Sequence, residues 1–423
     1  MTLPEQILDF GQRARRAARA LAQLSSEEKS AALQAMADEV VASAQPILAA
    51  NQKDLARARE TALAPAMVDR LTLNHERLTK MAEGIRQVAS LPDPVGEVLR
   101  QWTRPNGIEI TKIRVPIGVI GIIYESRPNV TSDAAVLCTK TGNATILRGG
   151  SESIDSNIAI ADALQRGGAR ADLPNDSILL IPQTDREAVR LMAEMDCYID
   201  MIVPRGGRAL IEAVVSHARM PVIKHAHGVC IIYVDEKADL EMAVEIIVNA
   251  KTQRPGVCNA AETLLVHRAV APALFQKLAP RLTSKSVELR ADAAAFAQLT
   301  TLHYERLKQS TEEDWSTEYL DYILAVKVVD SPNDAIEHIE GFGSHHSDCI
   351  VTRDEKLAER FLREIDSATV YWNASTRFTD GGEFGFGAEI GISTDKLHAR
   401  GPMGLEELTT YKYLIRGDGQ VRV

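Results

Sequence analysis

The chain has 423 residues, 45% of them hydrophobic and 25% charged, and its formal net charge is −10 at pH 7. This length exceeds one ordinary core and predicts two or more domains. The acidic balance argues against nucleic acid and membrane surfaces as partners, because both favour basic faces. No apolar run approaches the ~20 residues of a membrane span. The five scattered cysteines indicate a reducing, cytoplasmic setting rather than a disulfide framework.

The N-terminal residues 1–96 have the pattern of helices. Ser25 and Glu28 have the S-x-x-E spacing of a capping box, and apolar residues then recur at helical period. A second helical stretch covers residues 71–88 and ends at "LPDPVG" (91–96), because proline cannot continue a helix. From Glu97 the pattern becomes extended. The Asn106-Gly107 turn signal predicts a hairpin over residues 97–116.

Apolar strands then alternate with helical segments. This alternation indicates a parallel sheet covered on both faces, so we expect a doubly wound, nucleotide-binding α/β domain. The expected strands cover residues 118–124, 144–148, 177–182, 198–204 and 229–235, and a short helix covers residues 131–142.

The alternation resumes after Cys258, with strands at 262–267 and 348–352 and a helix at 271–282, and predicts a second α/β domain over about 234–366. From Tyr371 to Gly404 the chain is rich in glycine and polar residues. A structureless stretch of this length in a compact protein is seldom mere connection, so we expect a functional loop.

Cys258 is the sharpest candidate for chemistry. It lies in "KTQRPGVCNA", where Pro255 and Gly256 indicate a turn between two regular elements. Lys251 and Arg254 are close in sequence, and positive charge favours the nucleophilic thiolate. A packed, inert cysteine is the competing interpretation. The other four cysteines lie in apolar segments or, for Cys197, near a loop.

Two loops have the composition of anion-binding turns. A strand ends at Arg148-Gly149-Gly150-Ser151, and another ends at Pro204-Arg205-Gly206-Gly207 before a helix begins. Glycines allow close backbone approach, arginine pairs with phosphate, and a helix N-terminus attracts anions. A plain loop remains the alternative for each.

Two further segments carry polar side chains. "YESRPNVTSD" (124–133) offers Arg127 and Asn129 as donors, with an N-cap turn as the alternative, and "NASTRFTDGGEFGFGAEIG" (373–391) offers Asn, Ser, Thr and Arg, with a solvated loop as the alternative.

His225 and His227 lack a third metal ligand at a suitable spacing, and "HHSD" (345–348) has the pattern of a surface turn. We therefore expect no metal.

In the order of these landmarks the chain resembles the aldehyde dehydrogenase superfamily. The similarity covers "ESRPN", "GNATILRGGSES", the glycine pair at 206–207, the Gly-x-Cys setting of Cys258, and "STEYLDYILAVKVVDS". Over about residues 24–413 it is most similar to one branch, the γ-glutamyl phosphate reductases. Hydrolytic members of the superfamily keep a Glu that activates water. The corresponding stretch here, "KHAHGVC", has none, as suits a reductase.

The resemblance implies NADPH-dependent reduction of L-glutamate 5-phosphate to L-glutamate 5-semialdehyde and phosphate, in L-proline biosynthesis. Cys258 is the implied nucleophile, with its backbone N–H and either Asn129 or Arg127 as oxyanion donors. The implied cofactor-binding residues are Arg148, Gly149, Ser151, Glu152, Pro204, Arg205, Gly206, Gly207 and Glu318, with Arg148 suited to the 2′-phosphate of NADPH. The implied substrate-binding residues are Asn373, Ser375, Thr376 and Arg377.

The resemblance also implies a domain plan. Residues 1–96, 117–233 and 367–404 would form an NADP-binding domain, residues 234–366 a catalytic domain, and residues 97–116 with 405–423 an oligomerisation flap. We expect a homo-oligomer (dimer or tetramer) and consider association with a separate glutamate 5-kinase.

Three alternatives stay open: a CoA-dependent aldehyde dehydrogenase, a nucleotide-binding protein without catalysis, and a fusion with the kinase, for which the chain has no room.

Overall fold

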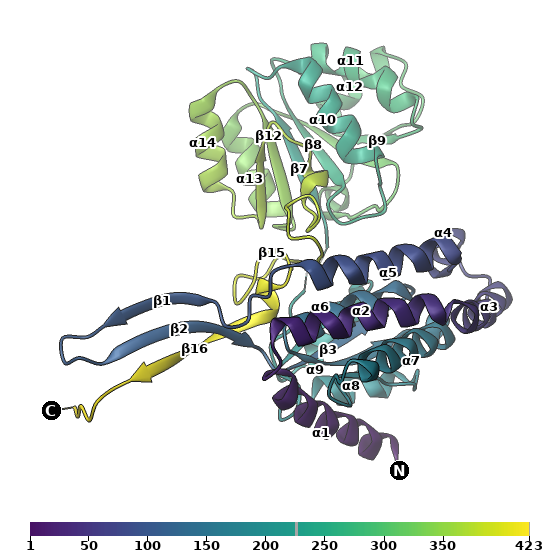
Figure 1. Cartoon of the computed structure of the whole chain (residues 1–423). Coiled ribbons are helices and arrows are strands. Elements are labelled where there is room, and N and C mark those ends of the chain that lie inside the picture. The colour runs from purple at the N-terminus through teal and green to yellow at the C-terminus, as the bar shows by residue number, and fades with distance from the viewer. Residues whose placement is uncertain (225–226, 423) are drawn as a thin grey trace. The chain divides into compact units, whose positions relative to one another are not determined.

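The computed structural model describes residues 1–224 and 227–422, which form two compact units (Figure 1). The first unit comprises Met1–Lys224, Gly385–Gly391 and residues 403–422, and the second comprises residues 227–384 and Ile392–Pro402. Each unit contains a parallel sheet connected by helices, which confirms the predicted α/β class. Within the described residues, no helix combines the length and the apolar character needed to cross a membrane.

The first unit opens with five helices. The predicted capping box begins α2: Glu28 N–H donates to Ser25 Oγ at 3.2 Å, and Ser25 N–H donates to Glu28 Oε2 at 2.7 Å. The fifth helix ends at Ser90, directly before the prolines of residues 91–96. The bounds are α1 (Leu3–Leu21), α2 (Ser26–Ala42), α3 (Ala44–Glu60), α4 (Pro65–Leu71) and α5 (His75–Ser90).

The parallel sheet of the first unit has the strand order β5-β4-β3-β6. The chain runs outward from β3 to β5 and then returns to place β6 on the other side of β3. The topological switch point therefore lies between β3 and β6. The bounds are β3 (Val119–Tyr124), β4 (Ala144–Gly149), β5 (Ile178–Leu180), β6 (Met201–Arg205), α6 (Asn129–Lys140), η1 (Ser151–Ser153), α7 (Ile154–Arg170), α8 (Arg186–Ala193) and α9 (Arg208–His217).

A three-stranded antiparallel ribbon extends from the helices of the first unit (Figure 1). It joins β1 (Val98–Thr103), β2 (Glu109–Pro116) and β16 (Thr409–Arg416), and η4 (Glu406–Leu408) precedes its last strand. Gly107 has φ +86° in the turn between β1 and β2, a conformation that suits glycine. The predicted hairpin and its pairing with the C-terminal segment are thereby confirmed.

The second unit has a seven-stranded sheet in the order β10-β9-β11-β8-β7-β12-β13, and every pairing in it is parallel. The bounds are β7 (Cys230–Val234), α10 (Leu240–Thr252), β8 (Ala261–His267), α11 (Ala271–Thr283), β9 (Glu288–Ala291), α12 (Ala293–Thr301), β10 (Leu307–Gln309), η2 (Glu312–Ser316), β11 (Ile323–Val329), α13 (Pro332–Phe342), β12 (Ser347–Val351), α14 (Glu355–Glu364), β13 (Thr369–Trp372) and η3 (Thr376–Phe378).

Hydrophobic clusters line both faces of this sheet. Phe275 and Leu278 of α11 pack with Leu264 of β8 on one face, and Ile339 of α13 and Phe361 of α14 pack on the other. Burying a side chain of this size contributes about 1.5–3 kcal/mol. Cover on both faces explains why these strands are continuous apolar runs.

The segment after residue 384 alternates between the units. Gly385–Gly391 belongs to the first unit, Ile392–Pro402 to the second, and the chain from residue 403 to the first again. In the second unit, β14 (Ile392–Ser393) pairs with β15 (Gly401–Pro402). Asp366 forms ion pairs with Lys396 and with Arg400, the latter at 2.6 Å, and these two cations lower the pKa of Asp366 to about 2.

Two predicted domain boundaries differ from the structure. The strand at 229–235 was assigned largely to the first domain (117–233), but β7 pairs with β8 and β12 in the second sheet. Residues 367–404 were also assigned to the first domain, but β13 pairs with β12. Buried strands of two parallel sheets have the same apolar pattern, so the sequence did not reveal where one sheet ended.

The predicted surface turn at 345–348 was wrong. His346, Ser347 and Asp348 are fully buried, and β12 begins at Ser347. Asp348 Oδ1 accepts a 2.8 Å hydrogen bond from Ile231 N–H, and Asp348 Oδ2 accepts one of 2.5 Å from Ser367 Oγ. His225 lies outside the described residues, and the described ones contain no group of three or more His, Cys, Asp or Glu placed to hold a metal ion.

Candidate active site

Cys258 lies in the turn between α10 and β8, at the amino edge of the second sheet. Its side chain is half-buried. A Cβ on Gly228 would lie 2.0 Å from the Cys258 carbonyl oxygen, so only glycine allows this approach of the two backbones. Cys230 Sγ donates to the same oxygen at 3.2 Å. These contacts hold the backbone that carries the thiol.

The other cysteines have different environments. Cys138, Cys230 and Cys349 are fully buried, and burial raises the pKa of the Cys138 and Cys349 thiols to about 12. These thiols stay protonated at neutral pH and are poor nucleophiles. Cys197 is exposed. Among the five, only Cys258 is half-buried and held in a turn.

Arg377 of η3 is the predicted substrate residue that lies beside the thiol turn. Its Nε donates to Gln253 Oε1 at 2.8 Å, and its Nη1 donates to Asn259 Oδ1. Burial and the charge of Arg254 lower the pKa of Arg377, and a Cys258 thiolate would raise it. By reciprocity, the Arg377 charge favours the thiolate form of Cys258.

Three other predicted substrate residues hold the protein together instead. Asn373 Oδ1 accepts from Thr352 N–H and Asn373 Nδ2 donates to Thr352 O, both at 3.0 Å. Ser375 Oγ caps η3 by accepting from Arg377 N–H, and the buried Thr376 hydroxyl donates to Asn259 O at 2.7 Å. These contacts use part of the hydrogen-bonding capacity of the three side chains, and direct binding of substrate by Asn373, Ser375 and Thr376 stays a prediction.

A buried ion pair underlies the thiol turn. Lys251 Nζ and Glu262 Oε2 are 2.5 Å apart, and both side chains are 0% exposed. Burial lowers the pKa of Lys251 and raises that of Glu262, and the attraction between the two charges opposes both shifts. Leu320 N–H donates to Glu262 Oε1 at 3.2 Å, which links the pair to the segment that carries Glu318.

Glu318, predicted to contact the cofactor, is half-buried near the same turn. Burial raises its pKa, while a hydrogen bond from Gly228 N–H and the charges of His227 and Lys251 oppose that rise. Gly228 therefore contacts both Glu318 and the backbone of Cys258.

The predicted cofactor loops of the first unit meet at the switch point between β3 and β6. Gly206 and Gly207 follow β6 and begin α9, and Glu125 follows β3. Glu125 Oε2 accepts from Gly207 N–H at 2.9 Å, and a Cβ on Gly206 would lie 2.4 Å from the same oxygen. An anionic group therefore occupies the N-terminus of α9, where a phosphate would also be favoured.

A second carboxylate lies at the neighbouring strand end. Glu152 of η1 accepts from Ser126 N–H at 2.5 Å and from Ser126 Oγ at 2.7 Å. Ser126 has φ +48°, an uncommon conformation for a residue with a side chain. Ser151 begins η1, and a Cβ on Gly149 would lie 2.1 Å from Asn157 Nδ2. Sequence reasoning found Glu152 but missed Glu125 and Ser126.

Arg148, predicted to contact the cofactor, bonds the backbone of the loop after β5. Its side chain is buried, and Nη2 donates to the carbonyl oxygens of Thr184 at 2.7 Å and Asp185 at 3.2 Å. These two hydrogen bonds stabilise the loop after β5, and a contact of Arg148 with a 2′-phosphate stays a prediction. Arg205, at the end of β6, lies against the backbone of Gly391, and Pro204 is inside β6.

The two predicted oxyanion donors lie at the start of α6. Asn129 is exposed, and its Nδ2 donates to Asp133 Oδ2 at 2.8 Å. Arg127 is half-buried directly before the helix.

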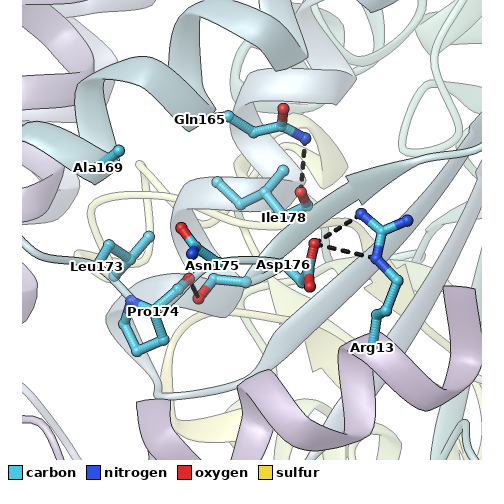
Figure 2. A pocket seen from close by; sticks show the side chains of 9 residues that line it. Arg13, Gln165, Ala169, Leu173, Pro174, Asn175, Asp176 and Ile178 are labelled. Carbon is cyan, nitrogen blue, oxygen red and sulfur yellow. Dashed lines mark hydrogen bonds and ion pairs between the residues drawn. The ribbon is translucent and has the colours of Figure 1, made fainter.

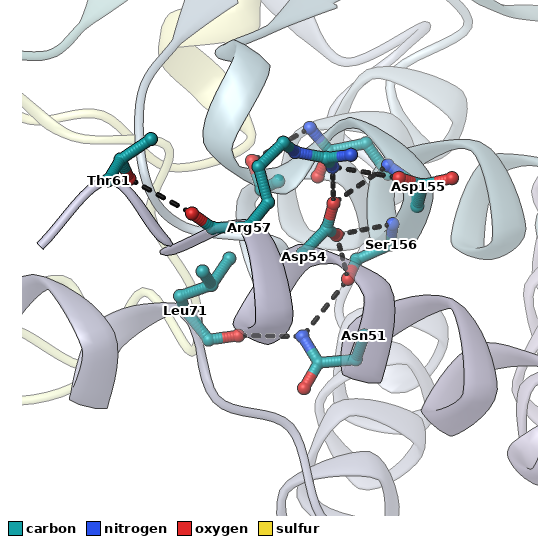
Figure 3. Close-up of polar contacts among 9 residues, drawn as sticks. Asn51, Asp54, Arg57, Thr61, Leu71, Asp155 and Ser156 are labelled. Carbon is teal, nitrogen blue, oxygen red and sulfur yellow. Dashed lines mark hydrogen bonds and ion pairs between the residues drawn. The ribbon is translucent and has the colours of Figure 1, made fainter. Parts of the chain in front are cut away.

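A polar network supports the N-terminus of α7, directly after η1 (Figure 3). Asp54 of α3 is fully buried and accepts from Ser156 N–H at 2.8 Å, from Ser156 Oγ at 2.6 Å and from Asp155 N–H at 3.2 Å. Arg57 pairs with both Asp54 and Asp155. A carboxylate from another helix thus caps α7 and holds η1, which carries Glu152.

A pocket of about 380 Å³ lies elsewhere in the first unit (Figure 2). Its polar groups bond one another: Asp176 accepts from Arg13, and Gln165 Nε2 donates to Ile178 O at 2.8 Å. It is lined by the C-terminal half of α7 and the segment before β5, away from the cofactor loops.

Comparison with known proteins agrees with this geometry. A model of the Aldehyde dehydrogenase family matches residues 4–315. A Gamma-glutamyl phosphate reductase of Moorella thermoacetica is 54% identical over 422 residues, covering 100% of both chains. The crystal structure of Gamma-glutamyl phosphate reductase from Thermotoga maritima has a TM-score of 0.96 at 45% identity, covering 99% of this chain and 100% of that one. An engineered glycolyl-CoA reductase with bound NADP+ shares the fold at 17% identity and a TM-score of 0.67, covering 96% of each chain.

The architecture of two parallel sheets with a cysteine in a tight turn is that of an oxidoreductase of aldehyde dehydrogenase type. The chain belongs to the aldehyde dehydrogenase family and, within it, to the gamma-glutamyl phosphate reductases. The predicted family is thereby confirmed.

Proposed function

We propose that this chain reduces L-glutamate 5-phosphate to L-glutamate 5-semialdehyde and phosphate, a step of L-proline biosynthesis, by way of a thioester on Cys258. One observation carries the chemistry: a half-buried thiol is held by Gly228 in a turn, and the Arg377 guanidinium bonds Asn259, the residue that directly follows Cys258. The names of relatives that match this chain over its full length support the choice of substrate.

In this mechanism the Cys258 thiolate attacks the acyl carbon of the substrate, and the carbon–oxygen bond to phosphate breaks. The Cys258 backbone N–H is the proposed first oxyanion donor, and Arg127 or Asn129 the second. Comparing Arg127→Ala with Asn129→Ala tests the second donor, because loss of a donor costs about 10²–10³-fold in kcat.

The nicotinamide cofactor fits the first unit by two observations. Gly206 and Gly207 leave the N-terminus of α9 without side chains, and this N-terminus lies at the switch point of the sheet. Gly149, Ser151, Glu152, Pro204 and Arg205 surround the same strand ends, and Glu318 remains a proposed contact from the second unit. When bound, the cofactor supplies the hydride that reduces the acyl group on the sulfur.

We propose NADPH as that cofactor, supported by the NADP+ held by the engineered relative of the same fold. Steady-state comparison of NADPH and NADH measures the preference. Because Arg148 bonds backbone carbonyls, we expect Arg148→Met to destabilise the protein without changing the ratio of kcat/KM for the two cofactors.

Cys258→Ala tests the function directly. We expect it to lower NADPH oxidation by L-glutamate 5-phosphate by about 10⁴-fold or more, while NADPH titration gives an unchanged Kd. Substantial turnover in this variant would refute the thioester route. Formation of acyl-CoA without phosphate release would instead favour a CoA-dependent reaction.

We further propose a cytoplasmic homo-oligomer whose contacts include β1, β2 and β16. The exposed Tyr411, Tyr413 and Ile415 on β16 support this role. Light scattering of the purified chain tests it, and a ~46 kDa monomer would contradict it. Association with glutamate 5-kinase is a separate proposal that co-sedimentation of the two proteins tests.

A further inference from the structure

We propose that Arg254 and Arg377 together bind the phosphate that leaves the acyl carbon, and that Gln253 is a positioning residue for Arg377. This inference rests on the proposed function and names which part of the substrate these arginines recognise. It starts from the partners that hold Arg377.

Neutral amides, rather than carboxylates, hold the Arg377 guanidinium. Its side-chain partners are Gln253 Oε1 and Asn259 Oδ1, and Arg377 forms no ion pair among the residues that the structure describes. Most other paired arginines of this chain contact a carboxylate, as Arg281 does with Glu245 and Arg290 with Asp314. An amide oxygen orients an N–H without neutralising its charge. Arg377 is therefore fixed in place with its positive charge available to a ligand.

Arg254 adds a second positive charge at the same place. It lies on the turn that leads to Cys258 and is exposed, and it makes no ion pair or side-chain hydrogen bond with any described residue. Arg254 directly follows Gln253, whose Oε1 accepts from Arg377 Nε. Burial and the charge of Arg254 lower the pKa of Arg377, while Asp380 opposes this. Repulsion between these two like charges costs free energy in the empty protein, and a bound anion recovers that cost.

The position of Arg254 and Arg377 relative to the Cys258 sulfur favours the substrate's phosphate, rather than its α-carboxylate, as their ligand. Arg377 Nη1 donates to Oδ1 of Asn259, the residue that directly follows Cys258, so the guanidinium is held on the thiol turn itself. A Cys258 thiolate would also raise the pKa of Arg377. In an acyl phosphate the leaving group is bonded to the attacked carbon itself, whereas the α-carboxylate lies at the far end of the substrate. The guanidinium fork matches phosphate oxygens, and two cations match a dianion.

In the proposed step the Cys258 sulfur displaces the phosphate from the acyl carbon. A carbon–sulfur bond forms, the carbon–oxygen bond breaks, and its electron pair stays on the phosphate. The phosphate leaves between the two arginines and takes up a proton from solvent. The same site would admit inorganic phosphate in the reverse direction.

Reverse kinetics separate the ligands, because phosphate is then a reactant of its own beside the semialdehyde and NADP+. We expect Arg254→Gln and Arg377→Gln to raise the KM for phosphate about 10-fold or more, with changes below about 3-fold in the KM for semialdehyde. Arg281 is an exposed arginine of α11, so Arg281→Gln is the matched control and should change neither KM value. A rise confined to the KM for semialdehyde would assign the arginines to the carboxylate and overturn the proposal.

Gln253→Glu tests the role of the neutral acceptor. It keeps the shape of the side chain and its hydrogen bond to Arg377 but neutralises the guanidinium. We expect the KM for phosphate to rise about 5-fold or more, with the fold unchanged by circular dichroism. An unchanged KM would show that the charge of Arg377 does not bind phosphate.

A second readout does not depend on turnover. Inorganic phosphate should slow iodoacetamide alkylation of Cys258 in the wild-type protein, as measured by mass spectrometry of the Cys258 peptide, and should protect much less in Arg254→Gln. Equal protection in both proteins would overturn the proposal. If the wild-type protein shows phosphate protection but no phosphate-dependent NADP+ reduction, the proposed function fails while the anion site stands.

Discussion

The two parallel sheets carry their candidate chemistry at opposite edges. In the first unit the groups lie at the carboxyl ends of β3, β4 and β6, where Glu125 and Glu152 bond backbone N–H groups. In the second unit Cys258 precedes β8, so the candidate site lies at the amino edge, and Arg254 and Arg377 accompany it. The proposed cofactor site follows the rule that open α/β sheets bind ligands at their carboxyl ends, whereas the proposed thiol site departs from it.

This difference indicates that one architecture, a parallel sheet covered by helices, supports different chemistry according to the residues at its edges. The carboxyl edge offers helix N-termini, which suit a dinucleotide phosphate. The amino edge of β7 and β8 offers a turn that presents a thiol, with a buried ion pair beneath it. Four substitutions test this difference between the carboxyl edge of the first sheet and the amino edge of the second.

The largest expected effect is at the buried ion pair beneath the thiol turn. Lys251→Met leaves Glu262 buried without its partner, and we expect a loss of about 3–5 kcal/mol in the free energy of unfolding, measured with urea. The double variant Lys251→Met with Glu262→Leu should recover most of the loss, because no unpaired charge remains. A loss below about 1 kcal/mol in the single variant would show that the pair is dispensable.

Asp348 gives the second unit a pH dependence. Burial raises its pKa from 3.8 to about 7, so the folded protein binds this proton more tightly than the unfolded chain. Its contribution to stability is full below about pH 4 and is lost as the pH rises through about 7, by up to about 1.4 kcal/mol per pH unit.

Asp348→Asn removes this titration, since the amide keeps an acceptor for Ile231 N–H and Ser367 can reverse its hydroxyl. Urea unfolding between pH 4.5 and 8 should show a flatter profile for the variant than for the wild-type protein. Parallel profiles would contradict the assignment.

Beneath the cofactor edge, Asp54→Asn should cost about 1–3 kcal/mol, because an amide cannot accept from both backbone N–H groups and pair with Arg57 as a carboxylate does. Asp155→Asn, which is partly exposed and also pairs with Arg57, should cost less. Equal losses would show that the cap of α7 is not the source.

The smallest effect concerns cofactor affinity. Because Glu125 occupies the N-terminus of α9, a cofactor phosphate must compete with it. Glu125→Gln should lower the Kd for NADPH about 3–10-fold, in line with the free energy of a charge near a helix end. Glu212→Gln on the exposed face of α9 serves as the control, and fluorescence titration measures both. Weaker binding in Glu125→Gln would show that the carboxylate assists the cofactor.

Sequence reasoning predicted the fold class, the ribbon and the turn at Cys258, because apolar periodicity, Asn-Gly and Pro-Gly signals are local. It assigned β7 and β13 to the wrong unit, because strand pairing is not encoded in the pattern of a single strand. It also gave Arg148, Asn373, Ser375 and Thr376 ligand roles, which stay predictions. It did not reveal that Arg148, Asn373 and Thr376 bond backbone groups distant in sequence. Composition reveals which side chains are able to bind a ligand, but only tertiary contacts reveal which are already engaged.

The alternation of residues 385–422 between the units limits how this protein can be recombined. A chimaera that exchanges only residues 227–384 with a relative would leave Ile392–Pro402 behind from the host. Its Lys396 and Arg400 would then face a foreign residue at the place of Asp366. A faithful graft must carry both pieces of the second unit, so the inserted gene segment has to be split in two.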